Sequence, residues 1–120
     1  MGNVLIVDDE SAISAYLAKL ISGLGHHVAT ASSASEMLAK LERGDCHLII
    51  ADILLPDAPV PTAWIQELCR RAKGKPVVLM TGAPSPELIA CATKCGVHAF
   101  LSKPFELAFI KDILKTVFGS

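Results

Sequence analysis

The sequence predicts an α/β protein of one domain, residues 1–120, built on a doubly wound parallel sheet of five strands. Short, almost wholly apolar runs such as Val4–Val7 and Leu48–Ile53 are bounded by acidic residues, as is typical of strands buried on both faces of a sheet. Segments with helical spacing of apolar residues alternate with these runs. A length of 120 residues allows one compact core.

The composition excludes several classes of protein. Hydrophobic residues make up 52% of the chain and the mean hydropathy is +0.48, yet no run approaches the roughly 18 apolar residues of a membrane span. A formal net charge of −1 argues against nucleic-acid binding, which needs a clustered basic face. The start Met1-Gly2-Asn3 lacks a signal peptide's cationic region. Four cysteines without a framework spacing fit reduced thiols, so a cytoplasmic location is expected.

The first half of the chain alternates between strand and helix signals. Gly25 stands where the end of a helix favours a left-handed residue. Ser33 and Glu36 form a capping-box pattern that opens a second helix, and Gly44 follows the end of that helix. We therefore expect a strand at Val4–Val7, a helix at Ser11–Leu24, a strand at His27–Ala31, a helix from the Ser33 cap through Leu41, and a strand at His47–Ala51.

The second half continues the alternation after a proline-rich loop at 56–61. The third helix is anchored by Trp64, Ile65 and Leu68. The fourth helix opens at Ser85-Pro86-Glu87, with proline at its first position. We expect the remaining strands at Pro76–Met80 and His98–Leu101, the fourth helix to close at Cys95-Gly96, and the last helix at Phe105–Phe118.

Five strand–helix units in strict alternation imply right-handed crossovers and helices on both faces of the sheet. Such a sheet commonly takes the flavodoxin-like order 2-1-3-4-5, with ligands at the carboxyl ends of the strands. The residues that directly follow each strand are therefore the candidates for function.

Polar side chains follow four of these strands: Asp8, Asp9 and Glu10, then Asp52, then Thr81, then Lys103. Asp8, Asp9 and Asp52 converge because their strands are neighbours in this order. Two carboxylates 4 Å apart repel by about 4 kcal/mol at a near-surface dielectric, so the group calls for a hard cation such as Mg²⁺. Lys103 and Thr81 would face a phosphoryl group, and together these are the parts of a phosphoryl-transfer site.

Each of these residues has a simpler explanation when taken alone. Asp9 would serve as the cap of the helix at Ser11, and Thr81 would cap a turn. The joint placement of the residues on one rim favours function. The same acids exclude a flavin-mononucleotide site, whose phosphate they would repel, and a glycine-rich nucleotide loop is missing.

The chain resembles the receiver domain of two-component response regulators, of the chemotaxis type, over essentially its whole length. The matching segments are Leu5-Ile6-Val7-Asp8-Asp9-Glu10, Leu48-Ile49-Ile50-Ala51-Asp52-Ile53-Leu54-Leu55-Pro56, Val77-Val78-Leu79-Met80-Thr81-Gly82-Ala83 and Phe100-Leu101-Ser102-Lys103-Pro104-Phe105. The resemblance implies that Asp52 accepts a phosphoryl group from a sensor histidine kinase or a histidine phosphotransfer protein. It also implies that Asp8, Asp9, Asp52 and the backbone carbonyl of Leu54 hold Mg²⁺.

The resemblance further implies a switch. Thr81 and Lys103 would bind the phosphoryl oxygens, and Thr81 and Phe100 would move on phosphorylation. That movement would reshape the face made by the fourth helix, the fifth strand and the fifth helix for a partner. The Lys103–Pro104 bond is expected to be cis. Such a domain promotes its own phosphorylation and dephosphorylation without being an enzyme for another substrate, and it is also found within hybrid histidine kinases.

Two departures from the family pattern stand out. The family commonly has a glycine about eight residues after the acceptor, whereas here the loop at 56–61 carries three prolines. Since proline is disfavoured inside a helix, the third helix is expected to start late or to lie differently. Phe100 replaces the more usual tyrosine, so it lacks a hydroxyl.

Two rival functions come from other classes. One is a pseudo-receiver, a binding module that is never phosphorylated and that usually lacks an acid or the lysine. The other is a haloacid-dehalogenase-like phosphatase with Asp8 as nucleophile. That family needs a second acid two residues on, where Glu10 is a weak substitute for Asp, and it generally needs a longer chain.

The histidines and cysteines are expected to have structural rather than metal-binding roles. The scattered histidines are expected to form no imidazole cluster, and Cys91 and Cys95 to act as small buried hydrophobes. An exposed apolar patch is expected from four residues of the last two helices, namely Leu88, Ile89, Leu107 and Phe109. Such a patch would bind a partner or a second copy of the chain.

Overall fold

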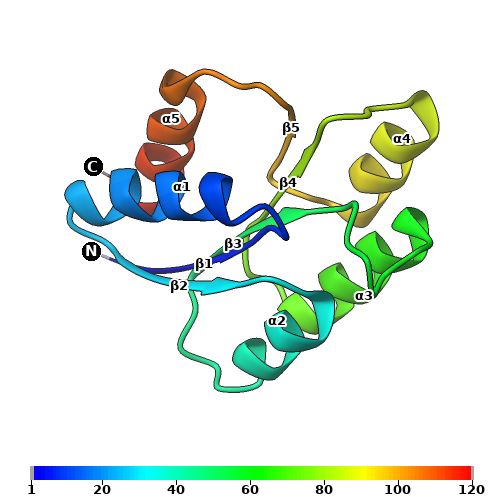
Figure 1. The fold of residues 1–120 in the computed structure, drawn as a ribbon, viewed down its shortest axis with the longest axis horizontal. Helices are drawn as coiled ribbons and strands as arrows, with labels where there is room; N and C mark the ends of the chain where they lie inside the picture. Colours follow the sequence, from blue (N-terminus) through cyan, green and yellow to red (C-terminus); the bar gives the residue numbers. More distant parts are fainter. Residues whose placement is uncertain (1, 120) are drawn as a thin grey trace.

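The computed structural model describes residues 2–119, which form a parallel five-stranded sheet covered by helices on both faces (Figure 1). The strand order is β2-β1-β3-β4-β5, as the sequence predicts. The elements are β1 (Asn3–Val7), α1 (Ser11–Gly23), β2 (His27–Ala31), α2 (Ala34–Leu41), β3 (Leu48–Asp52), α3 (Pro61–Ala72), β4 (Val77–Thr81), α4 (Pro86–Cys95), β5 (Ala99–Ser102) and α5 (Leu107–Phe118).

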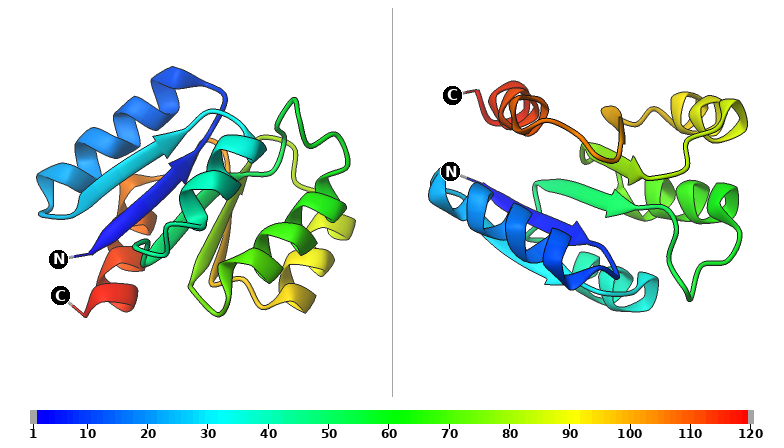
Figure 2. Two further views of the ribbon diagram at one scale, coloured as in Figure 1. Left: turned by 90° about the horizontal axis from the view of Figure 1, so that it is seen from below. Right: turned by 45° about the horizontal axis from the view of Figure 1, so that its top comes forward.

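The sheet separates two hydrophobic layers (Figure 2). Helices α1 and α5 pack on one face, against strand residues such as Ile6 and Ile50. Helices α2, α3 and α4 pack on the other, against strand residues such as Leu5 and Ile49. Successive strand residues point to opposite faces, so the near-continuous apolar runs seen in the sequence supply both layers at once.

Side-chain caps open α2 and α4, at Ser33 and Ser85, whereas α1 has no side-chain cap. Ser33 Oγ accepts from the Glu36 amide, and Ser85 Oγ accepts from the amide at the third position of α4. The carboxylate of Glu36 reaches back to the amide of Ser32 rather than of Ser33, so the capping box is shifted by one residue. Helix α1 begins after Glu10 without a side-chain cap, so Asp9 does not cap it.

The third helix starts late, as expected from the prolines. It begins only at Pro61, whose missing N–H costs nothing at the first helical position. The loop before it makes a tight turn closed by the bond from the Ala58 amide to the Leu55 carbonyl, 3.0 Å. The Asp57 carboxylate then accepts two bonds at the start of α2, from the amides of Ala34 (2.9 Å) and Ser35 (3.0 Å). The loop after β3 is thereby tied to α2.

Asp57→Asn is expected to lower the free energy of unfolding by about 1 kcal/mol at pH 7, because a neutral amide accepts these bonds more weakly. The two amide bonds lower the pKa of the Asp57 carboxyl. A lowered folded-state pKa gives stability that is present above the unfolded pKa, near 4, and is lost as the pH falls through the folded value. Urea titrations of both proteins should therefore differ at pH 7, and the difference should shrink as the pH falls below the unfolded pKa, near 4. A constant difference would contradict this account.

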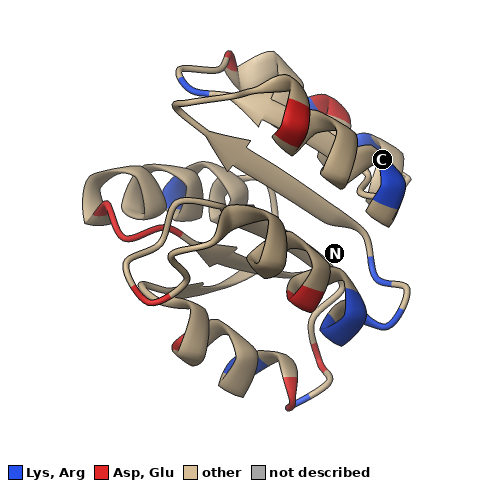
Figure 3. Cartoon of the chain, turned by 90° about the vertical axis from the view of Figure 1, so that its right-hand side faces the viewer, with Lys and Arg blue, Asp and Glu red and all other residues tan. Residues whose placement is uncertain are grey.

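Charged residues are distributed over several elements (Figure 3). Arg70 and Arg71 lie in the last turn of α3, where cations complement the helix dipole. Each of them pairs with Glu67 of the same helix. Among residues 2–119, no helix is both long and apolar enough to span a bilayer.

Two of the histidines, His26 and His47, pack against the ring of Phe118 near the end of α5. The ring of His26 stacks on Phe118 with centroids 4.7 Å apart, and His47 meets the same ring edge-on at 6.4 Å. The Gly2 amide donates to Nδ1 of His26 (3.2 Å). A Cβ built on Gly2 would lie 2.0 Å from Cε1 of Phe118, so only glycine allows this close approach. The contact holds the start of β1 beside the end of α5.

Candidate functional site

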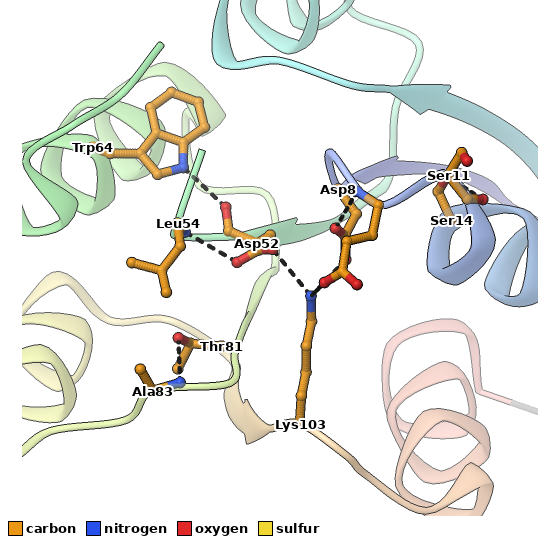
Figure 4. A network of polar contacts seen from close by, with 10 residues as sticks. Asp8, Ser11, Ser14, Asp52, Leu54, Trp64, Thr81, Ala83 and Lys103 are labelled. Carbon is orange, nitrogen blue, oxygen red and sulfur yellow. Dashed lines mark hydrogen bonds and ion pairs between the residues drawn. The ribbon is translucent and has the colours of Figure 1, made fainter. Parts of the chain in front are cut away.

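The carboxyl ends of β1, β3, β4 and β5 bring the predicted polar residues onto one rim (Figure 4). The β1–β3 ladder runs to the pair Val7–Ala51, so Asp8 and Asp52 stand side by side just beyond it. Asp52 and Thr81 are the last residues of their strands rather than the residues that follow them. The strand predictions at 47–51 and 76–80 were therefore shifted by one residue. This shift leaves all side chains on the expected rim.

Lys103 reaches the two buried carboxylates. Its Nζ lies 2.7 Å from Oδ2 of Asp8 and 3.0 Å from Oδ2 of Asp52. A longer contact of 3.7 Å joins it to Oε1 of Glu10. The Lys103–Pro104 peptide bond is cis, as the family resemblance implies. The ammonium is thus placed between the acids by the end of β5.

Backbone amides aim the carboxylates. Oδ1 of Asp8 accepts from the Glu10 amide at 2.9 Å, and Oδ1 of Asp52 accepts from the Leu54 amide at 3.0 Å. In both cases the other oxygen is the one that faces Lys103. Each acid therefore has one oxygen fixed by its own loop and one directed into the shared site.

The site is short of positive charge. Burial raises the pKa of the Asp52 carboxyl, and the Asp8 carboxylate adds to this increase, although the Leu54 amide and Lys103 oppose it. Burial alone would lower the pKa of the Lys103 ammonium, but its bonds to Asp8 and Asp52 outweigh burial, so the net shift is upward. One ammonium faces several carboxylates, and the arrangement favours an added cation.

The oxygen donors suit a hard divalent ion. Carboxylate oxygens of Asp8, Glu10 and Asp52 lie within 4.8 Å of one another, and all-oxygen donor sets favour Mg²⁺ or Ca²⁺. The side chain of Asp9, which the sequence placed in this group, is exposed and lies outside it. Glu10 takes its place here, although no metal role is expected for it from the sequence.

Thr81 and Phe100 lie near the acids in different environments. Thr81 is fully buried, and its Oγ1 accepts from the Ala83 amide at 3.1 Å (Figure 4). Its main-chain carbonyl accepts from the Lys103 amide at 2.8 Å, which couples the ends of β4 and β5. Phe100 is half-buried and packs against the layer formed with α3 and α4.

Trp64 makes a contact with the site that the sequence did not reveal. Its position in the sequence predicts only an anchor of α3, and Trp64 is indeed buried there, 4% exposed. Its indole N–H also donates to the main-chain carbonyl of Asp52, with Nε1 and O 3.2 Å apart. Twelve residues of sequence and a proline-rich loop separate the two, and no spacing rule connects them.

The apolar patch is smaller than predicted. Leu88 is 9% exposed and belongs to the core beneath α4, so its inclusion was wrong: its position on α4 faces the sheet. Ile89 (45%), Leu107 (38%) and Phe109 (51%) are exposed.

The cysteines of α3 and α4 pack together, as expected of small hydrophobes. Cys91 and Cys95 are half-buried. Burial, with the neighbouring thiol of Cys95, raises the pKa of Cys69 to about 11. A thiol that stays protonated at neutral pH is a poor nucleophile.

Comparison with known proteins identifies the family of the chain. The family model described as "Response regulator receiver domain" matches residues 4–115. The chain is 30% identical over 113 residues to the CAI-1 autoinducer sensor kinase/phosphatase CqsS of Vibrio cholerae, covering 92% of this chain and 16% of that protein. It is 33% identical over 116 residues to the transcriptional regulatory protein CusR of Escherichia coli, covering 95% of this chain and 50% of that protein. The chain thus spans half or less of these relatives.

Solved structures share the whole fold. The chemotaxis protein CheY4 of Vibrio cholerae superposes with a TM-score of 0.83 at 27% identity, covering 98% of both chains. The beryllofluoride-activated receiver domain dimer of NtrC4 superposes with a TM-score of 0.87 at 28% identity, covering 99% of this chain and 98% of that one. With the site's geometry and the match over residues 4–115, these findings show that the chain belongs to the response regulator receiver domain family and acts in phosphorelay signal transduction.

Proposed function

We propose that Asp52 is the residue that accepts the phosphoryl group, with the whole of residues 1–120 acting as one receiver domain. The observation that carries this proposal is the pairing of two buried carboxylates, Asp8 and Asp52, with one ammonium at 2.7 and 3.0 Å. The two carboxylates would bind a metal cation, and the lysine ammonium would bind an anionic phosphoryl group beside it. This is the requirement of phosphoryl transfer to a carboxylate.

In the proposed reaction, an Asp52 oxygen attacks the phosphorus of a phosphohistidine on a sensor histidine kinase or a histidine phosphotransfer protein. The O–P bond forms while the N–P bond breaks, and the bonding pair stays on the imidazole nitrogen. Oδ2 of Asp52 is the oxygen that would attack, because its partner is the side chain of Lys103, which can move to the phosphoryl oxygens, whereas Oδ1 accepts from the Leu54 amide of its own loop. Lys103 and the Thr81 hydroxyl would then bind phosphoryl oxygens.

Mg²⁺ is the proposed cofactor, held by Asp8, Asp9, Asp52 and the backbone carbonyl of Leu54. When bound, it would neutralise charge shared by the acids and the phosphoryl oxygens. The donor set of the site fits this ion, since its side-chain ligands are oxygens. Glu10 is the competing donor, because its carboxylate lies within 4.8 Å of Asp8 and Asp52 here.

Asp9→Asn is expected to raise the dissociation constant for Mg²⁺ about tenfold, and Glu10→Gln less than about threefold. Asp9 has the shorter side chain and so loses less rotamer entropy on binding, whereas Glu10 already contacts Lys103 at 3.7 Å. The quenching of Trp64 fluorescence, or calorimetry if there is no quenching, measures the affinity. If Glu10→Gln raised the dissociation constant more than Asp9→Asn, Glu10 rather than Asp9 would be the metal ligand.

The switch proposed from the family pattern uses Thr81 and Phe100 to reshape the face of α4, β5 and α5. Exposed Ile89, Leu107 and Phe109 lie on these helices and support a partner site or a homodimer there. The double variant Ile89→Ser/Phe109→Ser is expected to prevent self-association in the presence of beryllofluoride, as measured by sedimentation. A wild-type protein that stays monomeric with beryllofluoride would contradict the homodimer.

The rivals have less support. A pseudo-receiver usually lacks an acid or the lysine, and here both acids and Lys103 are in contact. A haloacid-dehalogenase-like phosphatase would need an aspartate two residues after Asp8, where this chain has Glu10, and the family model that matches residues 4–115 is that of a receiver domain. We propose no enzyme activity beyond the domain's own phosphorylation and dephosphorylation. We place it in the cytoplasm, where its four free cysteines would stay reduced.

Acetyl phosphate with Mg²⁺ tests the proposal. Intact mass should increase by one phosphoryl group, and borohydride trapping with peptide mapping should place the label on Asp52. Label on Asp8 would overturn the proposal in favour of the phosphatase. A protein that binds Mg²⁺ but is not labelled by any phosphodonor would overturn it in favour of the pseudo-receiver.

A further inference from the structure

Trp64 touches the proposed acceptor through the peptide backbone rather than through the carboxylate. It lies in the first turn of α3, and its indole is directed at the end of β3 (Figure 4). The ring is 4% exposed, and Nε1 lies 3.2 Å from the carbonyl oxygen of Asp52. Since Trp64 is the chain's single tryptophan, any change at this contact has its own optical signal.

The Asp52 carbonyl needs a donor from outside the sheet. The next amide, that of Ile53, donates to the Met80 carbonyl of β4 at 3.2 Å. The C=O and N–H of a trans peptide point in opposite directions, so the Asp52 carbonyl faces the β1 side. The β1–β3 ladder has ended there, at the pair Val7–Ala51. A buried carbonyl must find a partner, and the indole of Trp64 supplies it.

We infer that Trp64 is a positioning residue for phosphoryl acceptance: its indole N–H fixes the Asp52 peptide and, through it, the direction of the attacking carboxylate. The inference rests on the proposed function of Asp52. The same short segment carries the Leu54 amide, bonded to Asp52 Oδ1, and the Leu54 carbonyl proposed as a metal ligand. One bond at the head of the segment therefore orients both the nucleophile and a metal donor.

The far end of this segment is held separately. Asp57 binds the first amides of α2 at 2.9 and 3.0 Å, so the loop between Asp52 and Asp57 is anchored at both ends by neighbouring helices. Support of this kind matters because small displacements of a reacting group strongly slow a reaction. With the N–H lost, the Asp52 peptide is free to tilt while the indole ring still fills its place in the core.

The test replaces the N–H and keeps the ring. Benzothienylalanine incorporated at position 64 has nearly the shape of tryptophan but lacks the donor, and Trp64→Phe is a second, genetically simpler variant. Ile65→Val is the matched control: Ile65 is a fully buried neighbour in α3, and its replacement trims the core without removing a hydrogen bond to Asp52. For each protein, the acetyl phosphate labelling rate, the Mg²⁺ dissociation constant and the urea midpoint are measured.

We expect the isostere to be labelled about three- to tenfold more slowly, because it lacks one hydrogen bond. We also expect it to bind Mg²⁺ more weakly. Ile65→Val should lower the urea midpoint and leave the labelling rate unchanged. Labelling of the isostere at the wild-type rate would overturn the inference, even if its stability falls. So would equal slowing in Ile65→Val, because the effect would then follow stability alone. If the wild-type protein is not labelled on Asp52, the proposed function fails first and this inference with it.

Discussion

Asp52→Asn should slow phosphoryl labelling by acetyl phosphate at least about 10³-fold, because no other group can replace the nucleophile. The same change should stabilise the metal-free protein. Burial raises the pKa of the Asp52 carboxyl in the folded state. The protonated carboxyl therefore stabilises the fold at low pH, and this contribution to the free energy of unfolding is lost as the pH rises through the folded pKa. A neutral amide avoids that loss. We expect a gain of about 1 kcal/mol at pH 7, measured by urea denaturation without Mg²⁺.

The matched control for this prediction is Asp112→Asn, an exposed acid of α5, which should change neither labelling nor stability. Adding Mg²⁺ should reverse the order of stability, since the wild-type site gains a ligand that the variant binds poorly. Retained labelling in Asp52→Asn together with its loss in Asp8→Asn would move the nucleophile to Asp8.

Lys103→Met is expected to lower the free energy of unfolding by about 3 kcal/mol, the usual cost of leaving buried charges unpaired. Its side chain is 13% exposed, and those of its partners Asp8 and Asp52 are 0% and 6% exposed, so water screens little of the resulting repulsion. Part of the loss should return with millimolar Mg²⁺, because a divalent cation also separates the two carboxylates. Urea titrations with and without Mg²⁺ measure both effects.

Lys111→Met serves as control, because Lys111 is exposed on α5 and its replacement should cost almost nothing. The carboxylates raise the pKa of Lys103. The stability that it provides is therefore complete below its unfolded pKa, near 10, and is lost only as the pH rises through a higher value. A Lys103→Met protein as stable as wild type at pH 7 would show that the ion pairs contribute little.

The sequence was sufficient for the fold because a parallel sheet buried on both faces produces apolar runs that are hard to mistake. Caps such as Ser33 and Ser85 then marked helix starts from local chemistry alone. The rim followed from topology: once β1 and β3 are neighbours, Asp8 and Asp52 must meet. The sequence also placed Lys103 on this rim but assigned it to phosphoryl oxygens, so its pairing with Asp8 and Asp52 came only from the structure.

What the sequence could not predict depends on the directions of single side chains. Asp9 and Glu10 are adjacent in sequence, and which of them turns toward Asp52 is a matter of rotamers. Leu88 and Ile89 are also adjacent, and a small rotation of α4 decides which one is buried. The bond from Trp64 to Asp52 spans a proline-rich loop, and the bonds of Asp57 start within that loop. The path of the loop follows no periodic rule, so only the folded chain reveals these bonds.

The contact of Gly2 with Phe118 places both ends of the described chain together, at the amino-terminal edge of the sheet and far from the acidic rim (Figure 2). A short glycine-rich peptide would join them, and new ends opened in the turn after α3, near Lys73 and Gly74, would give a circular permutant. Such a permutant keeps every residue of the rim in place. Reporter proteins attached at the new ends would lie beside the carboxyl end of α3, the helix whose Trp64 bonds to the Asp52 carbonyl, and their signal would test whether the proposed phosphorylation moves this helix.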